Sequence, residues 1–167
     1  MALSDRRPII GVMGGSRVSP DVANMAFELG ALIAAQGWIL LNGGRDLGVM
    51  RASAEGAKSN GGLTIGILPG NSKWDANPFI DIPIVTGLSD ARNLVNVLSS
   101  DIVVALPGSA GTMSEIALAL KNGRPVILMR MEMDRIFKEY TISGLLHSAQ
   151  TPEECIALVQ QLLVAKN

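Results

Sequence analysis

The stretch "DIVVALPGSAGTMSEIALAL", residues 101–120, decides the fold. Its first six residues form an apolar, largely β-branched run, which predicts a strand buried on both faces. Pro107 and Gly108 end that run, and the small residues up to Gly111 predict a tight turn. Helical periodicity follows over about 112–122, so the stretch predicts a strand, a turn and a helix, the repeating unit of a parallel sheet.

The same pattern extends along the whole chain. We expect one doubly wound, Rossmann-like α/β domain over residues 1–167, with a mainly parallel sheet of about six strands and helices on both faces. The segment 69–80 has no periodicity and is expected to be a loop. The predicted strands are 8–13, 38–42, 63–68, 80–85, 101–106 and 124–129, and the predicted helices lie near 20–36, 46–59, 89–100, 112–122 and 152–165.

Several residues mark where these helices begin and end. Ser19 and Thr151 each precede a proline, the pattern of an N-cap followed by proline at the first helical position. Gly37 and Gly123 are typical helix stops. Ser89 is predicted to cap the helix near 89–100.

Composition bounds the class of protein. The chain has 167 residues, of which 48% are hydrophobic and 17% charged, and its formal net charge is −1, with no dense basic tract. Nucleic-acid binding is therefore not expected. No run is long enough to span a membrane and the first seven residues are polar, so we expect a cytoplasmic protein. Cys155 is the single cysteine and cannot form an internal disulfide, and the single histidine, His147, lies outside any metal-binding pattern.

Glycines follow five of the predicted strands, at the edge of the sheet where ligands bind in this architecture. Tight strand-to-helix turns require some of them whatever the function. The first turn reads "GGSR" and the second strand ends at Asn42, which does not fit a dinucleotide fingerprint, and the chain has no Walker A sequence. These glycines are Gly14, Gly15, Gly43, Gly44, Gly48, Gly70, Gly87, Gly108 and Gly111.

The turn after residue 106 has two interpretations. Thr112 and Glu115 match a capping box, which stabilises a helix start by about 1 kcal/mol. The same turn brings several amide N–H groups and the positive end of a helix together beside small residues, which favours an anion site. Both interpretations can hold together.

Arg92 is unexpected in the first turn of its helix, where the helix dipole disfavours a cation. We expect the strands 80–85 and 101–106 to be neighbours, which places Arg92 and Glu115 at equivalent positions on adjacent helices. A structural ion pair explains this arrangement as well as a binding or catalytic pair does.

Four segments together resemble the Lonely Guy family, long described as possible lysine decarboxylases. They are "GGRDLGVM" (43–50), "GILPG" (66–70), "DARN" (90–93) and "LPGSAGTMSE" (106–115). The resemblance covers nearly the whole chain. In that family a P-G-G-x-G-T-x-x-E motif and an upstream arginine form the active site of nucleoside 5′-monophosphate phosphoribohydrolases. Arg92 and Glu115 match those two positions, and the resemblance implies catalytic roles for them if the chain is such a hydrolase.

The chain departs from the hydrolase pattern at several positions. Ser109 replaces the second glycine of the motif, Asn93 follows the arginine where the family has lysine, and Ser114 stands in place of the first acid of a Glu-Glu pair. The early first strand, "GVMRASAEGA" (48–57) and "SDARNLVNVLSSD" (89–101) are more similar to the branch that contains molybdenum cofactor carrier proteins.

That branch implies a carrier that binds the molybdenum cofactor by its phosphate and ligates no metal through its own side chains. A phosphoribohydrolase and a nucleotide-binding module without catalysis remain alternatives, and retention of Glu115 supports the hydrolase. The cofactor-binding residues expected are Gly14, Gly15, Ser16, Gly43, Gly44, Gly48, Arg92, Asn93, Pro107, Gly108, Ser109, Ala110, Gly111, Thr112 and Glu115.

The expected partners are a phosphorylated small molecule and further copies of this chain. Met129, Met131 and Met133 alternate after the last predicted strand and suggest an adaptable apolar face, so we expect a homodimer or homotetramer. The resemblance also implies molybdoenzymes as acceptors of the cofactor. Trp74, in the 69–80 loop, can cover a planar ligand ring or pack on a partner subunit. Arg17 and Arg45 follow the first two strands and could reach a phosphate.

Overall fold

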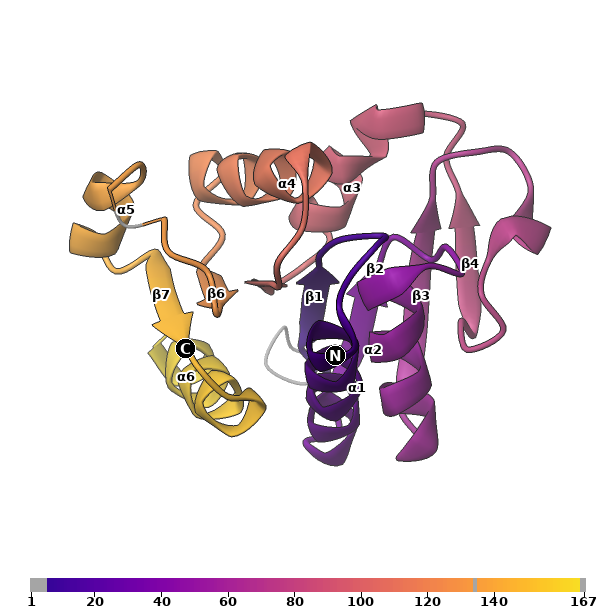
Figure 1. Cartoon of the computed structure of the whole chain (residues 1–167), viewed down its shortest axis with the longest axis horizontal. Helices are drawn as coiled ribbons and strands as arrows, with labels where there is room; N and C mark the ends of the chain where they lie inside the picture. Colours follow the sequence, from indigo (N-terminus) through magenta and orange to yellow (C-terminus); the bar gives the residue numbers. More distant parts are fainter. Residues whose placement is uncertain (1–5, 134, 166–167) are drawn as a thin grey trace.

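The computed structural model describes residues 6–133 and 135–165, which form a doubly wound α/β fold around a parallel sheet (Figure 1). The strand order is β4-β3-β2-β1-β5-β6-β7, and every neighbouring pair is parallel. The seven strands are β1 (Ile9–Met13), β2 (Ile39–Asn42), β3 (Leu63–Leu68), β4 (Ile82–Val85), β5 (Ile102–Ala105), β6 (Val126–Met129) and β7 (Leu146–Ala149).

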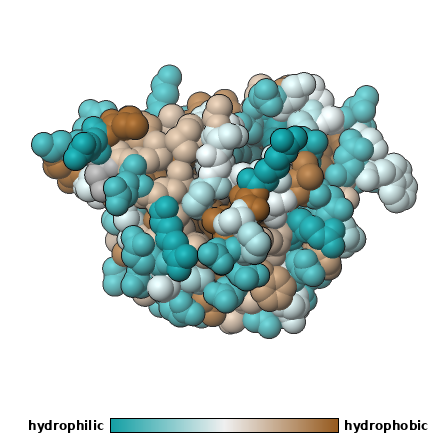
Figure 2. Space-filling view, in the orientation of Figure 1, coloured by the Kyte–Doolittle hydropathy of each residue, from teal (hydrophilic) through white to brown (hydrophobic). Residues whose placement is uncertain are grey.

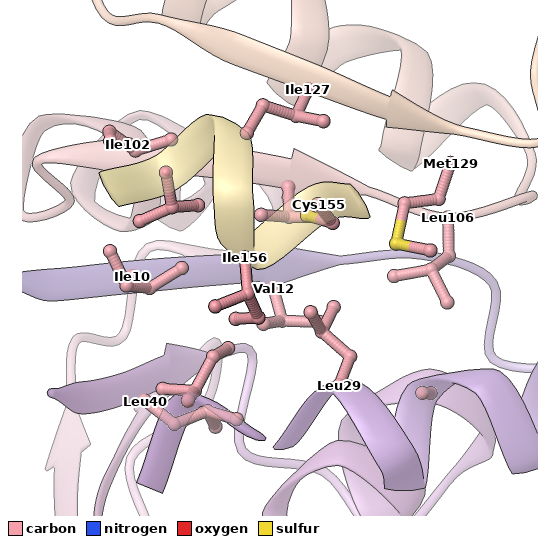
Figure 3. Packing of buried hydrophobic residues seen from close by; sticks show 14 of the residues in the cluster. Ile10, Val12, Leu29, Leu40, Ile102, Leu106, Ile127, Met129, Cys155 and Ile156 are labelled. Atoms are coloured by element: carbon pink, nitrogen blue, oxygen red, sulfur yellow. The ribbon is translucent and has the colours of Figure 1, made fainter. Parts of the chain in front are cut away.

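Helices cover both faces of the sheet. On one face, α1 (Pro20–Ala35), α2 (Gly48–Ser59) and α6 (Pro152–Ala165) pack against Ile10, Val12 and Leu40, and Figure 3 shows the side chains of this cluster interdigitating. On the other face lie α3 (Arg92–Leu98) and α4 (Ala110–Lys121). A short helix, α5 (Lys138–Ile142), precedes β7.

The six predicted strands are confirmed within a few residues, because continuous apolar runs are typical of strands buried on both faces. The sequence prediction missed β7 and α5. The strand β7 has only four residues, Leu146 to Ala149, of which two are the polar His147 and Ser148. A run this short and polar gives no strand pattern, and β7 is placed by pairing with β6 at the edge of the sheet.

The expectation that the strands 80–85 and 101–106 are neighbours is wrong. The strand β4 lies at one edge and pairs only with β3, whereas β5 pairs with β1 and β6. After β4 the chain returns through α3 to the far side of β1, so the strand order reverses between β1 and β5. Arg92 and Glu115 are nevertheless brought together, because α3 and α4 pack side by side.

The predicted helix ends are mostly confirmed. The Ser19 Oγ accepts a hydrogen bond from the Val22 amide at 3.4 Å, and the Thr151 Oγ1 accepts one from the Glu154 amide at 3.2 Å. Gly37 and Gly123 have φ of +74° and +66°, which favour glycine. The prediction for Ser89 is wrong, because it begins the 3-10 turn η3 (Ser89–Ala91) and α3 starts at Arg92 with no side-chain cap.

The predicted loop 69–80 contains one short 3-10 turn, η2 (Lys73–Asp75), and is tied to the loop after β2. The Asn77 Nδ2 donates hydrogen bonds to the Gly44 and Arg45 carbonyl oxygens, both at 3.2 Å. Trp74 is 85% exposed on η2, with the Lys73 ammonium 5.3 Å from its ring centre. Trp74 does not line the three cavities around the carboxyl edge of the sheet that are described below.

The apolar surface differs from the one expected. Met129 and Met133 lie in the core and Met131 is half-buried, so their alternation reflects packing. Figure 2 shows a mostly hydrophilic face with an apolar patch over α5, where Ile136 and Ile142 are exposed. A second exposed set of apolar residues lies on β4 and α3: Ile82, Ile84, Leu94 and Leu98.

Two further properties bear on the class of protein. None of the helices in the described ranges has the length and hydropathy that crossing a bilayer requires. Cys155 is buried in α6, and burial raises the pKa of its thiol to about 12, which leaves it protonated and unreactive at neutral pH.

Candidate functional site

A cavity of about 210 Å³ opens at the carboxyl edge of the sheet, where the strand order reverses between β1 and β5. This is the position at which doubly wound folds bind ligands. Ten of the fifteen residues predicted to bind the cofactor line it, together with Val12, Met13, Arg45, Met50 and Asp90. The ten are Gly14, Gly15, Ser16, Gly43, Arg92, Asn93, Ser109, Gly111, Thr112 and Glu115.

The helix α4 points its N-terminus at this cavity. Its N-cap is Ser109, whose side chain makes no capping hydrogen bond, and the first bond to the cap goes from the Met113 amide to the Ser109 carbonyl at 3.1 Å. The amides of Ala110, Gly111 and Thr112 therefore lack a capping side chain among the described residues. Uncapped amides at the positive end of a helix are the groups that bind a phosphate.

The predicted capping box of Thr112 and Glu115 is wrong. The helix starts at Ala110, so both residues lie inside it, and Glu115 does not reach back to a cap. Its Oε1 instead accepts a hydrogen bond from the Asn96 Nδ2 on α3 at 2.7 Å. Neither residue therefore caps the start of α4, and its first amides have no side-chain cap.

Glu115 is a buried acid that lines the cavity and is only 7% exposed. Loss of hydration raises its pKa, and the Asn96 hydrogen bond and the charge of Arg92 oppose that rise. Asn96 is itself fully buried, and its Oδ1 has no hydrogen-bond partner. The carboxyl group is thus held in position by an amide that makes no other side-chain hydrogen bond among the described residues.

Arg92 lies across the cavity from α4. Its Nη1 donates a hydrogen bond to the Ile67 carbonyl oxygen at 2.7 Å, which leaves its other N–H groups for a ligand. Burial lowers the pKa of Arg92. The positive charge of Arg45 lowers this pKa further, whereas the negative charges of Glu115 and Asp90 raise it. Arg92 and Glu115 form no ion pair, so the structural explanation offered for this pair is not supported.

Gly43 makes room for that arginine. A Cβ at this position would clash with the Arg92 Nη1 and would lie 2.8 Å from the Nη2 and 2.7 Å from the Met50 sulfur. From the sequence, Gly43 was expected to be among the residues that bind the cofactor. In the structure the space beside it is filled by the guanidinium.

Gly44 and Gly48 also have roles other than the one expected. Both have positive φ, +74° and +46°. A Cβ on Gly44 would lie 3.0 Å from the Gly66 Cα, and one on Gly48 would clash with the Gly15 carbonyl oxygen. They allow neighbouring loops to pack closely, and neither is among the residues that line the cavity.

The remaining predicted residues lie close by. Pro107 and Gly108 line a neighbouring cavity of about 620 Å³, which also includes Arg17 and shares Gly15, Ser16 and Ser109 with the first. Ala110 lines neither cavity but contributes its amide to the start of α4. On the other side, Arg45 and Asp90 connect the first cavity to a third one of about 670 Å³ that reaches Asp75 on η2.

Sequence reasoning missed three residues that shape the site. Met50 lines the cavity, Asn96 holds Glu115, and Asn42 fixes the turn after β2 by donating to the Met50 carbonyl at 2.8 Å and accepting from the Gly44 amide at 2.8 Å. A signal for Asn96 was available, because an asparagine between Val95 and Val97 is unusual in an apolar run.

The fold and the cavity thus define a doubly wound protein with a cavity at the carboxyl edge of its sheet, lined by the start of a helix and an arginine. The chain belongs to the SLOG cluster4 family, whose profile matches residues 7–156. It is also similar to proteins of two described functions, one close and one more distant.

The close similarity is to proteins that bind the molybdenum cofactor. The molybdenum cofactor binding protein of Rippkaea orientalis is 46% identical, with a TM-score of 0.89 over 95% of this chain and 99% of that one. The molybdenum cofactor carrier protein of Chlamydomonas reinhardtii is 47% identical, with a TM-score of 0.87 and the same coverage. A cytokinin riboside 5′-monophosphate phosphoribohydrolase of Mycobacterium tuberculosis is 32% identical over 65% of this chain and 63% of its own length.

Proposed function

We propose that this protein binds the molybdenum cofactor, or its metal-free pterin, by the terminal phosphate and delivers it without transforming it. The observation that carries the proposal is the uncapped N-terminus of α4, which faces a cavity that the half-buried Arg92 also lines. The similarity to carrier proteins, at 46–47% identity over nearly the whole chain, supports the same ligand.

The phosphate fits this end of the cavity. The amides of Ala110, Gly111 and Thr112 and the guanidinium of Arg92 would hold it through charge-assisted hydrogen bonds. Arg45 and Ser16 also line the cavity and can complete the contacts. The larger cavities on either side give room for the rest of a cofactor that does not fit in about 210 Å³.

The protein is not expected to ligate the metal itself. In the described ranges, no three His, Cys, Asp or Glu side chains gather in a way that could hold a metal ion. The cofactor carries its own dithiolene, which binds molybdenum, so affinity should depend on contacts to the phosphate and the ring.

We further propose that the protein is a homodimer or homotetramer and passes the cofactor to molybdoenzymes. The exposed apolar residues on β4 and α3 support an interface between copies, because Ile82 and Ile84 lie on the same face of the sheet as the helix residues Leu94 and Leu98. Pro83, in the middle of this edge strand, lacks an N–H, which favours packing of faces over pairing of strand edges.

A second candidate function is phosphoribohydrolase activity. One observation favours it, because Arg92 and Glu115 line the same cavity at the positions that match the hydrolase motif. A carboxylate beside the ribose could stabilise the positive charge of an oxocarbenium-like transition state. Incubation with AMP tests this candidate. Release of adenine and ribose 5-phosphate that is lost in Glu115→Gln would establish the hydrolase and contradict the carrier.

The carrier itself is tested by anaerobic loading and transfer. The purified protein is mixed with isolated cofactor, separated from free cofactor by size exclusion, and analysed for molybdenum and pterin. We expect both to remain with the protein in equal amounts and then to activate a cofactor-free molybdoenzyme. A dephosphorylated cofactor serves as the control and should not be retained. Equal retention of the two forms would contradict a site built around the phosphate.

A further inference from the structure

The orientation of one amide in the cavity is fixed by a hydroxyl on the neighbouring helix. The Ser114 Oγ lies 2.7 Å from the Gly111 carbonyl oxygen and 2.9 Å from the Asn93 Nδ2. A hydroxyl has one hydrogen, and the Gly111 carbonyl can only accept, so Ser114 donates to Gly111. It must then accept from Asn93. If the amide were turned over, Ser114 would give its hydrogen to Asn93 and leave two oxygens facing each other at 2.7 Å.

This arrangement leaves an acceptor on the cavity side of α3. Asn93 lines the cavity, and with its NH₂ group bound to Ser114 its remaining polar atom is the Oδ1. That oxygen makes no hydrogen bond to the residues that the structure describes and is not among the buried unsatisfied atoms, so it is accessible. In this orientation the Oδ1 of Asn93 is available to accept a hydrogen bond from a ligand, a role that the sequence did not suggest.

A second acceptor lies one residue beyond Ser114 on α4. Glu115 uses its Oε1 for the Asn96 hydrogen bond, and its Oε2 makes no hydrogen bond within the described residues. The cavity thus has two chemically distinct sides. The start of α4 and Arg92 offer donors suited to an anion, whereas the Asn93 Oδ1 and the ionised Glu115 carboxylate offer acceptors.

We propose that Asn93, oriented by Ser114, makes this cavity select phosphorylated ligands that carry an O–H or N–H donor close to the phosphate. Asn93 would accept a hydrogen bond from that donor, and Glu115 would accept a second. The inference rests on the proposed phosphate site. It adds to that site a requirement on the rest of the ligand, met by polyols and by amine-bearing heterocycles and not by plain alkyl phosphates.

Two small phosphate esters of equal length test this selection. Glycerol 3-phosphate carries two hydroxyl donors, and propyl phosphate carries none. Dissociation constants are measured by titrating each ester into the ¹⁵N-labelled protein and following the amides of residues 110–112. We expect the wild-type protein to bind glycerol 3-phosphate about fivefold more tightly, the effect of one neutral hydrogen bond of about 1 kcal/mol.

Variants assign the preference to the amide. In Asn93→Leu the ratio of the two constants should fall to about one. In Ser114→Ala the amide is free to turn its NH₂ group towards the phosphate, so propyl phosphate should bind more tightly than it does to the wild type while the ratio falls. Asn24→Leu, a matched change on the exposed part of α1, should retain the wild-type ratio.

The outcomes separate this inference from the proposed function. Equal binding of the two esters by the wild type, or an unchanged ratio in Asn93→Leu, would overturn the selection by Asn93 while leaving the phosphate site intact. If neither ester shifts the amides of residues 110–112, the phosphate site itself is wrong and the inference falls with it.

Discussion

Replacement of Gly43 by alanine should weaken ligand binding without touching a ligand directly. The added methyl group would clash with the Arg92 Nη1 and come within 2.8 Å of the Nη2. Both atoms, and the Met50 sulfur 2.7 Å from the added methyl group, are at the ends of flexible side chains, so these side chains will move and the backbone will not. Gly43 has no positive φ, and alanine can therefore adopt its conformation without strain.

The size of the effect follows from what Arg92 loses. Displacement breaks the 2.7 Å hydrogen bond to the Ile67 carbonyl and moves the positive charge away from the phosphate position. A hydrogen bond to a charged group contributes about 1.5–3 kcal/mol, so we expect the dissociation constant of a phosphorylated ligand to rise about tenfold or more. The free energy of unfolding should change by about 1 kcal/mol or less, because the lost Ile67 hydrogen bond is only partly buried.

A double-mutant cycle with Arg92→Ala separates this mechanism from others. Binding of the isolated cofactor is measured by anaerobic titration calorimetry for the wild type, the two single variants and the double variant. If Gly43→Ala acts only through Arg92, the double variant should bind no more weakly than Arg92→Ala alone. Additive losses would show that Gly43 contacts the ligand itself, and wild-type affinity in Gly43→Ala would refute the argument from geometry.

Three further predictions follow. Gly111→Val should weaken binding of inorganic phosphate about tenfold at an unchanged melting temperature, because a Cβ there meets no atom within 4 Å and projects from a cavity wall. The control Ala117→Val changes an exposed residue of the same helix and should bind phosphate as the wild type does. A normal phosphate affinity in Gly111→Val would remove α4 from the site. Light scattering at micromolar protein concentration should give the molar mass of at least a dimer. The double variant Ile84→Asp, Leu98→Asp should have the mass of a monomer. A monomeric wild-type protein would contradict this interface. Burial raises the pKa of Glu115, so the contribution of Glu115 to stability is present below its ordinary pKa and is lost as the pH rises through the raised pKa. In that pH window, Glu115→Gln should reduce the dependence of the unfolding free energy on pH by up to about 1.4 kcal/mol per pH unit. An unchanged pH profile of stability would show that Glu115 is not desolvated.

The fold could be predicted wherever local pattern and tertiary environment agree. The run Ile102 to Ala105 is apolar throughout because both faces of β5 are covered, and its sequence alone indicates that environment. The strand β7 could not be found in this way, since only its pairing with β6 identifies it. The prediction that β4 and β5 are neighbours was wrong for a related reason. The point at which the strand order reverses is a property of the whole sheet and cannot be found from a local pattern.

The candidate site could be located from sequence but its contacts could not. Glycines after successive strands indicated the correct edge, and Arg92 and Glu115 do line one cavity there. The roles of Gly43 and Gly44 could not be foreseen, because each depends on which side chain or backbone lies opposite. The capping box failed because α4 already begins at Ala110, before Thr112, and Glu115 bonds instead to Asn96, 19 positions away.

Anaerobic titration of the isolated molybdenum cofactor, with AMP titrated in parallel, tests the central proposal most directly. The account predicts that the wild-type protein binds the cofactor, that Arg92→Ala weakens this binding about tenfold or more, and that the bound cofactor is recovered chemically unchanged. Tight binding of AMP together with no binding of the cofactor would contradict it.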